Sequence, residues 1–188
     1  MTDISYPGSQ RVVEVASRKG VALDIRFMPA YAHTAQEASA AVGAELGQIV
    51  ESRVFVAPRP EGRLVAIVCL VSGRNQVDLS LLAAVTGEVE IRPATAREAG
   101  ELTGYCVGGI PPFGHGRDVP IVMDQDLCRY QWVWAAGGTD KAVFRLAPRV
   151  LRMLSNAVVA PVATASWRRA AATPQFQPRL GFGALAGA

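Results

Sequence analysis

Apolar and polar residues alternate along several short stretches of the chain, which is the pattern of β-strands with one buried face. Two long stretches of this kind, Ile49 to Ala57 and Arg63 to Ser72, are separated by a turn over Pro58 to Gly62. Strands joined by so short a turn pair with each other, so the pattern predicts a β-hairpin. The other predicted strands are Val21 to Phe27, Glu88 to Arg92, Val119 to Met123, Gln131 to Ala136, Lys141 to Arg145 and Val158 to Val162, with a turn over Gly137 to Asp140 between two of them.

Helices are predicted where apolar residues recur every three or four positions behind a capping residue. We expect Ser9 to cap a first helix that runs to Lys19 and ends at Gly20. The other predicted helices begin at the capping boxes Thr34 to Glu37 and Thr95 to Glu98, at Asp78 before Leu79 to Val85, and at Pro148 before a helix to about Ser155, while Asp124 to Arg129 is a turn or a short helix.

Helices and strands interleave along the chain, but hairpins dominate the strand pairing. This favours a mixed α/β (α+β) fold of one domain, in which a bent or partly closed mixed sheet carries helices on its outside. Residues 9–162 are expected to form the domain and residues 1–8 an N-terminal extension. Residues 163–188 are rich in Ala, Gly and Pro without a period, and we expect them to form a mobile tail.

Composition narrows the class of protein. Half of the 188 residues are hydrophobic, the net charge is +3 and the isoelectric point is near 9.0, which permits contact with nucleic acid without requiring it. Lys19 and Lys141 are the only lysines; arginine suits phosphate contacts, although a GC-rich genome produces the same bias. The three cysteines lack metal or disulfide spacing, which indicates a reducing compartment. With no signal peptide or membrane span, we expect a soluble, cytoplasmic protein.

The candidate chemistry lies in one loop, Gly104 to Gly116. Gly108 and Gly109 can adopt positive φ and turn backbone N–H groups toward one point, and Pro111 with Pro112 stiffens the exit. Such a loop binds an oxyanion or a carbonyl without a charged side chain, although the same residues also occur in plain connections between a helix and a strand. It is neither a Walker A loop nor a GxGxxG fingerprint, and the chain has no GxSxG elbow.

Several segments in order along the chain match one family. They are Val77-Asp78-Leu79, Ala94 to Glu98, Leu102 to Tyr105, Gly108 to His115, Trp134 to Gly138 and Ala142 to Leu146, preceded by His33-Thr34, Glu37-Ala38, Gln48 to Val50 and Ser52. In these segments the chain resembles the YbaK/EbsC-type (ProX-like) aminoacyl-tRNA deacylases, which are related to the editing insertion of bacterial prolyl-tRNA synthetases. The resemblance covers roughly Ser9 to Val162.

The resemblance implies a free-standing hydrolase that cleaves the ester of mischarged aminoacyl-tRNA in trans, without a metal or another cofactor. Its partners would be the 3′ acceptor end of aminoacyl-tRNA and a synthetase, and no membrane. The family's GxxxP loop is here Gly108 to Pro112. Its backbone, from Gly108 and Gly109 through Ile110, Pro111 and Pro112, would bind the carbonyl and the terminal adenosine, while water or a group of the substrate attacks.

One position departs from the family pattern. The strand after Gln48 usually carries a lysine in the family, and here Glu51 stands in its place. Arg53 lies on the same face of the strand, so it could pair with Glu51 or replace the lost cation; Glu51 could instead bind the α-ammonium group, or deacylation could be lost and a binding module remain. Gly108, Glu51 and Arg53 are therefore the candidate catalytic residues.

Further candidates for substrate binding surround these residues. His115 is a candidate contact of the terminal nucleotide, and Tyr105 and Phe113 are candidate walls of the amino-acid pocket. His33, Thr34 and Asp140 lie where the family borders its site. Trp132 and Trp134 alternate on a predicted strand and are expected in the core rather than as a platform for stacking bases.

Overall fold

The computed structural model describes residues 6–28 and 34–165. The α-helices of this part of the chain are α1 (Pro7–Arg18), α2 (Ala35–Val42), α3 (Leu79–Thr86), α4 (Ala96–Thr103) and α5 (Pro148–Ser155), with short 3₁₀ turns η1 (Leu46–Gln48), η2 (Pro60–Gly62) and η3 (Gln125–Arg129). None of these helices has both the length and the apolarity that a membrane span needs.

The strands form three sheets. The largest has the order β5-β2-β3-β6-β9, a smaller one β1-β8-β7, and a pair β10-β4 completes the set. The strands are β1 (Ile25–Phe27), β2 (Val50–Pro58), β3 (Leu64–Ser72), β4 (Asn75–Val77), β5 (Arg92–Pro93), β6 (Ile121–Asp124), β7 (Val133–Ala136), β8 (Ala142–Leu146), β9 (Val158–Ala160) and β10 (Ala163–Ala165). Pairing is antiparallel for β2 with β3 and for β7 with β8, but parallel for β3 with β6 and for β6 with β9, so the mixed α+β fold is confirmed.

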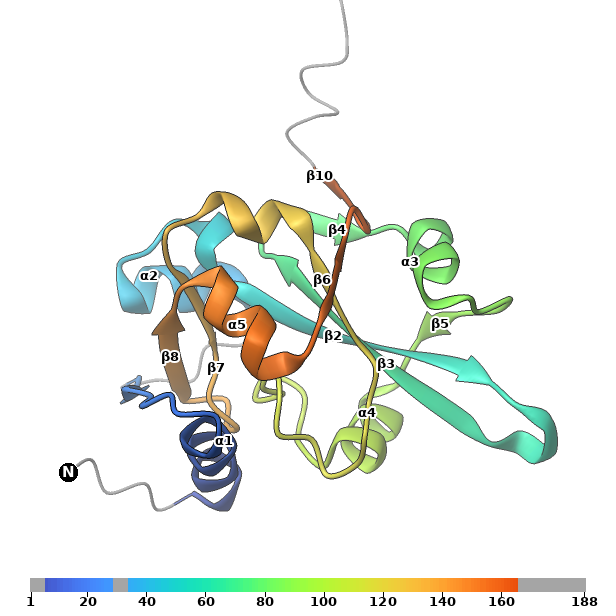
Figure 1. The fold of residues 1–188 in the computed structure, drawn as a ribbon, viewed down its shortest axis with the longest axis horizontal. Coiled ribbons are helices and arrows are strands. Elements are labelled where there is room, and N and C mark those ends of the chain that lie inside the picture. The colour runs from blue at the N-terminus through green and yellow to red at the C-terminus, as the bar shows by residue number, and fades with distance from the viewer. Residues whose placement is uncertain (1–5, 29–33, 166–188) are drawn as a thin grey trace, which may run out of the picture.

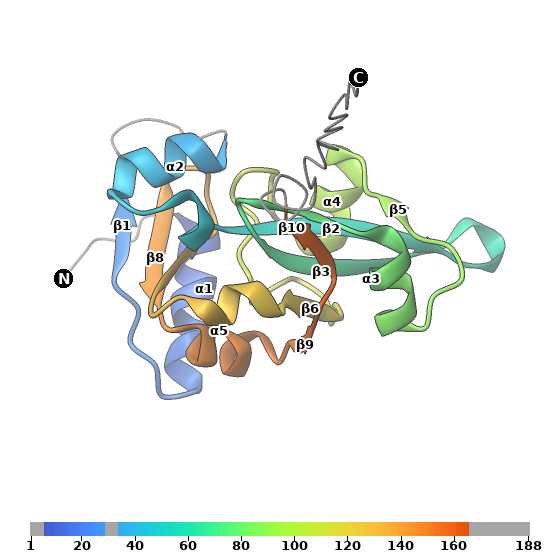
Figure 2. The same ribbon diagram turned by 90° about the horizontal axis from the view of Figure 1, so that it is seen from above.

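The long hairpin of β2 and β3 runs through the molecule and connects its two halves (Figures 1 and 2). One face of these strands packs with α1, α5 and the β1-β8-β7 sheet in the main core, around Leu70, Phe144 and Leu151. The other face packs against Leu82 of α3 through Phe55 and Ile67. Because β3 is covered on both faces, it is apolar along almost its whole length.

The two faces of β2 carry different residues. Phe55 and Ala57 belong to the α3 side, whereas Val50 and Val54 pack toward the main core. Since side chains alternate along a strand, Glu51 and Arg53 lie on the α3 side and Ser52 on the opposite side. This division places polar groups on both sides of the strand where the candidate site forms.

Most predicted elements agree with the structure, and the exceptions lie at their ends. The first helix begins at Pro7, with Tyr6 as its N-cap, so the prediction that Ser9 caps it was wrong; Ser9 is buried inside the helix. Other predicted strands are shorter: the ordered strand before Met28 is Ile25–Phe27, and of Glu88 to Arg92 only Arg92 is in a strand. The predicted tail begins with a strand, because Ala163–Ala165 pairs with the unpredicted β4.

Candidate functional site

A cavity of about 230 Å³ opens beside the first half of β2. It lies where β2 meets the loop after α4, the β7–β8 turn and α2. No described strand other than β3 pairs with residues 50–53, because β5 pairs only with Phe55 and Val56, so the strand presents an open edge to the cavity. The lining residues are Met28, Thr34, Ala35, Ala38, Val42, Ile49, Val50, Glu51, Ser52, Arg53, Val107, Gly108, Ile110, Trp134, Ala135, Ala136, Thr139, Asp140, Ala142 and Val143.

The glycine loop enters the cavity through a tight turn. The N–H of Gly109 donates to the carbonyl of Cys106 at 3.0 Å, and Gly108, the third residue of this turn, has φ +93°. A positive φ at that position is typical of a type II turn and favours glycine. The expectation of positive φ therefore holds for Gly108, whereas Gly109 has an ordinary φ and its N–H closes the turn instead of facing a ligand.

Gly109 is needed for a different reason, the close approach of two backbones. A Cβ atom on Gly109 would lie 2.7 Å from the backbone Cα and C of Thr139. A Cβ on Gly108 would meet only the Cβ of Asp140, at 3.6 Å. The loop after α4 is thus packed directly against the β7–β8 turn, and this contact sets the position of Gly108 at the cavity.

Two backbone N–H groups at the cavity are available for a ligand. Within residues 6–28 and 34–165, neither the N–H of Gly108 nor that of Ile110 donates a hydrogen bond to the protein. Both residues line the cavity. Unpaired backbone donors around a concave site can bind the oxygen of a carbonyl, and they hold it more strongly once negative charge develops there.

Glu51 and Arg53 form an ion pair at the cavity. The same carboxylate oxygen, Oε2 of Glu51, accepts from Nε of Arg53 at 2.8 Å and from its Nη2 at 2.7 Å. The arginine side chain is 47% exposed and the glutamate 26%, so the pair contributes little to stability. Of the alternatives left open by the sequence, pairing of Arg53 with Glu51 is what the structure contains.

Asp140 and Thr34 line the cavity from two different elements, the β7–β8 turn and the start of α2. Asp140 makes no ion pair within the described part of the chain, and it lies on the turn that packs against Gly108. Thr34 caps α2: its Oγ1 accepts from the N–H of Glu37 at 3.1 Å, and the Glu37 carboxylate accepts from the N–H of Thr34. Among the described residues, the charged side chains that line the cavity are two carboxylates, Glu51 and Asp140, and one guanidinium, Arg53.

Other predicted site residues lie behind the loop and do not line the cavity. Pro111, Pro112 and Phe113 are buried, and the Phe113 ring packs 5.8 Å from that of Phe144 in the main core. His115 Nε2 hydrogen-bonds the carbonyl of Pro111 at 2.9 Å, and Tyr105 donates to the carbonyl of Gly114 at 2.8 Å.

Burial lowers the pKa of His115 below its ordinary value, against a smaller opposing effect of the Pro111 carbonyl, and burial raises the pKa of the Tyr105 phenol. A neutral imidazole and a neutral phenol suit residues that brace the loop from inside. His33 lies outside the described residues.

Several cavity residues were not singled out from the sequence. The wall under α2 is apolar, with Met28, Ala35, Ile49, Trp134 and Val143 forming one cluster. These residues come from segments as far apart as Met28 and Val143, so local patterns could not group them. Trp134 was expected in the core and is 6% exposed, but Trp132 is 40% exposed, so its assignment to the core was wrong.

Ser52 is the most informative residue that the sequence reasoning missed. Its Oγ is buried without a hydrogen-bond partner in the described structure, a property that only Ser9 shares among the described side chains. Buried hydroxyl groups are nearly always paired, and Ser52 belongs to the residues around the cavity. Strand alternation could have indicated it, since it lies on the side of β2 that carries Val54, which packs against the cluster that contains Ile110.

No group of three or more His, Cys, Asp or Glu side chains that could hold a metal ion occurs within the described ranges. The polar groups around the cavity are backbone amides, hydroxyls, the Glu51–Arg53 pair and Asp140.

Comparisons with known proteins identify the family. Residues 30–154 match the aminoacyl-tRNA editing domain. A candidate Cys-tRNA(Pro)/Cys-tRNA(Cys) deacylase of Enterococcus faecalis, EbsC, is 25% identical over 70% of this chain and 77% of its own. The multifunctional Ser/Thr-tRNA deacylase ProXp-y of Escherichia coli K12 is 29% identical over 80% of this chain and 90% of its own.

A solved structure supports the same conclusion. It is that of a candidate trans-editing enzyme for prolyl-tRNA synthetase, which is 43% identical, superposes with a TM-score of 0.75, and covers 85% of this chain and 98% of its own. The resemblance inferred from the sequence is confirmed, and the chain belongs to the aminoacyl-tRNA editing domain family.

Proposed function

We propose that this protein hydrolyses the ester bond of mischarged aminoacyl-tRNA, acting in trans to a synthetase and in the cytoplasm, where tRNAs are charged. The observation that carries the proposal is the meeting of the unpaired Gly108 and Ile110 amides with Arg53 and Asp140 around one cavity. This arrangement fits an aminoacyl ester, which has a carbonyl oxygen, an α-ammonium group and a nearby anionic backbone.

The loop amides would act on the carbonyl. The N–H groups of Gly108 and Ile110 donate to the carbonyl oxygen, and these bonds strengthen when attack by water makes it an oxyanion. A bond forms between the water oxygen and the carbonyl carbon, the bond from that carbon to the ribose oxygen breaks, and the ribose oxygen leaves with a proton that comes from the water. The chain forms no covalent intermediate in this scheme and needs no metal ion.

The charged groups would orient the substrate. Asp140 lies beside Gly108 without an ion-pair partner in the described structure, so it suits the α-ammonium group next to the carbonyl. Arg53 retains exposed surface while bound to Glu51 and supplies the only cation among the described residues that line the cavity. It would face the terminal phosphate or the developing oxyanion.

A binding module of the same fold is the second candidate function. The observation that favours it is the Glu51–Arg53 pair itself. Glu51 stands where members of the family usually carry a lysine, and its carboxylate neutralises the charge of Arg53. Such a module would hold the aminoacyl-adenosine end without cleaving it.

Deacylation assays separate the two candidates. Ala-, Ser- and Cys-charged tRNAs are incubated with the wild-type protein and with Glu51→Lys, and release of the amino acid is followed at equal protein concentration. We expect the wild type to hydrolyse at least one of the three. No turnover by the wild type combined with a gain in Glu51→Lys would establish the binding module instead.

Ser52→Ala provides a test of the cavity as a binding site. An unpaired buried hydroxyl costs about 1–3 kcal/mol, so its removal should leave the melting temperature unchanged or raise it. If a ligand supplies the missing partner, the same variant should lower kcat/KM for the preferred aminoacyl-tRNA by about tenfold, the worth of about 1.4 kcal/mol.

Ser9→Ala is the matched control, because Ser9 has the same unpaired buried hydroxyl in α1 and does not line the cavity. It should share the effect on melting temperature and leave activity unchanged. Equal activity of both variants would remove Ser52 from the binding site.

A further inference from the structure

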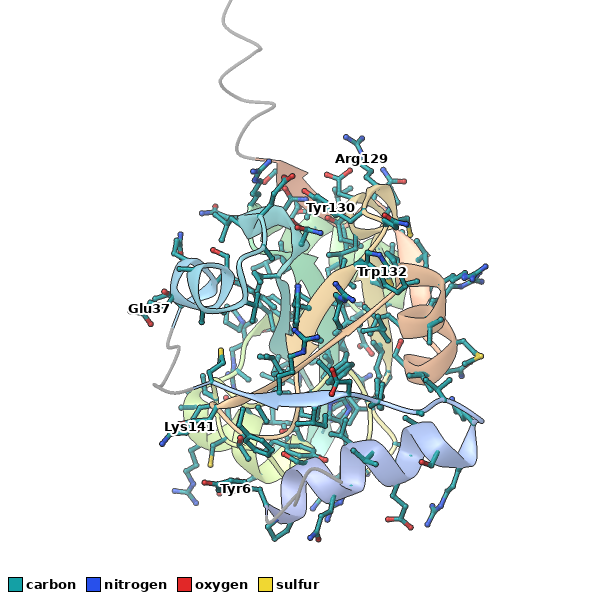
Figure 3. The ribbon with its side chains drawn as sticks, turned by 90° about the vertical axis from the view of Figure 1, so that its left-hand side faces the viewer. Tyr6, Glu37, Arg129, Tyr130, Trp132 and Lys141 are labelled. Atoms are coloured by element: carbon teal, nitrogen blue, oxygen red, sulfur yellow. The ribbon has the colours of Figure 1, made fainter. Side chains whose placement is uncertain are left out.

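The outer face of the β1-β8-β7 sheet is only partly covered. Its inner face, with Ile25, Phe144 and Ala135, belongs to the main core. On the outer face, Trp134 and Val143 pack under α2, whereas Arg145 and Trp132 stay exposed. In Figure 3, Trp132 lies beside α5, on the opposite side of the view from Glu37 of α2.

Arginine and tryptophan side chains alternate across this face. The guanidinium carbon of Arg145 lies 5.2 Å from the ring centre of Trp132 and 5.8 Å from that of Trp134. The guanidinium of Arg26 also lies near the Trp134 ring, 5.2 Å from its centre. These distances are within the range of cation–π attraction, so the four side chains form one stacked row, which we call the Trp–Arg row.

Only one of the two guanidinium groups in the Trp–Arg row has a carboxylate partner among the described residues. Arg26 pairs with the exposed carboxylate of Asp24 at 3.1 Å, but Arg145 has no carboxylate partner in the described part of the chain. Arg149 and Arg152 add exposed positive charge on the neighbouring α5. A guanidinium stacked on an indole and free of carboxylates is available for a phosphate or for the face of a base.

Trp132 is held in place although its ring is exposed. The side-chain amide of Gln48 donates to the carbonyl of Trp132 at 3.0 Å, and Trp132 directly precedes β7. An indole that is 40% exposed, backed by a guanidinium and fixed at its backbone, is a preorganised stacking surface.

The Trp–Arg row is continuous with the cavity. Trp134 is both a member of the row and a wall of the cavity, and Trp132 lies two residues earlier in the chain, about 7 Å along the strand direction. A molecule whose reacting end occupies the cavity could therefore extend along the row. The chemistry that fits is a single-stranded polynucleotide, because bases stack on indole rings and phosphates pair with arginines.

We propose that the Trp–Arg row binds the unpaired 3′-terminal nucleotides of tRNA, with a base stacked on Trp132 and the adjoining phosphate paired with Arg145. This inference rests on the proposed function for the identity of the strand. It assigns Trp132 and Arg145 to binding of the RNA and not to the reaction at the ester.

Binding of uncharged tRNA tests the inference without requiring hydrolysis. The probes are a tRNA transcript that ends in CCA and the same transcript without these three nucleotides, and the dissociation constant is measured at one fixed salt concentration. Trp132→Ala should weaken binding of the complete transcript by about fivefold or more, the smallest effect of losing one stacked base, and should not change binding of the shortened one. Arg145→Ala should act in the same direction, and Trp132→Phe should retain most of the affinity.

Arg63→Ala is the matched control, because Arg63 is also an exposed arginine with no carboxylate partner in the described structure but lies at the end of the β2–β3 hairpin. It should affect both transcripts alike. Unchanged affinity of a folded Trp132→Ala, equal losses with both transcripts, or a loss that appears only in binding of a synthetase would each overturn the inference. Loss of tRNA binding by Trp132→Ala in a protein that hydrolyses none of the charged tRNAs would contradict the proposed function and leave the inference standing.

Discussion

Gly109→Ala is expected to reduce deacylation by about 100-fold or more, because small displacements of positioning groups have effects of that size. The added Cβ would lie 2.7 Å from the backbone of Thr139 and 2.9 Å from the backbone nitrogen of Asp140. Neither backbone atom can move like the end of a flexible side chain, so the loop and the turn must separate. The separation displaces Gly108, Ile110 and Asp140 together. Steady-state kcat/KM with the preferred aminoacyl-tRNA measures the loss.

Two other glycines distinguish this steric effect from backbone strain. Gly87→Ala introduces an alanine at φ +71° where a Cβ meets nothing within 4 Å, so it should cost about 1–2 kcal/mol of stability and no activity. Gly108→Ala adds similar strain at φ +93° with an ordinary contact at 3.6 Å and should fall between the two in activity. Full activity of a folded Gly109→Ala would show that contact between the loop and the turn does not position the site.

Local signals were sufficient to predict most helices. The capping boxes at Thr34 and Thr95 and the cap at Asp78 are formed in the structure, and Pro148 occupies the first turn of α5 as expected. A cap requires only a residue and the backbone within three positions of it, so sequence patterns capture it well. Ser9 misled the prediction because Pro7, which suits a first helical turn equally well, starts α1 two residues earlier.

Features that depend on distant partners were harder to predict. The β4–β10 pair joins residues more than eighty positions apart, and neither strand has enough alternation to indicate it. Trp132 and Trp134 are the same kind of residue on the same face of the strand, so the sequence pattern treats them alike. In the structure, α2 covers only Trp134. Which part of a sheet face a helix covers is decided by tertiary packing, and period-two alternation carries no information about it.

The candidate site shows the same division. The glycine loop was located from its composition, and the face shared by Glu51 and Arg53 followed from strand alternation; the ion pair between them is present. The contact of the loop with the β7–β8 turn was not visible, because Gly109 and Thr139 are thirty residues apart and meet only through the tertiary fold. For the same reason, the turn of the loop buries Pro111 to Phe113, which a linear reading had placed against the substrate.

Arg53→Ala is expected to lower kcat/KM by about 100-fold, because a cation about 4 Å from a developing charge contributes up to about 4 kcal/mol at an effective dielectric of 20. Arg53→Lys should recover part of the loss, since a lysine keeps the positive charge but lacks the planar guanidinium, whose two N–H groups bind Glu51. Glu51→Ala should cause a smaller loss, because Arg53 keeps its charge but not its position. Single-turnover rates with the preferred aminoacyl-tRNA separate these effects on chemistry from effects on binding.

Arg59→Ala is a suitable control, because Arg59 also pairs with a glutamate, Glu88, but lies away from the cavity. It removes the same kind of exposed ion pair, so any effect on stability should be similar and small, and deacylation should be unchanged. The sign of the Glu51→Ala effect decides what the glutamate does. A loss of rate means that Glu51 holds the cation in place, whereas a gain means that it only neutralises Arg53, and that result would favour the binding module over the enzyme.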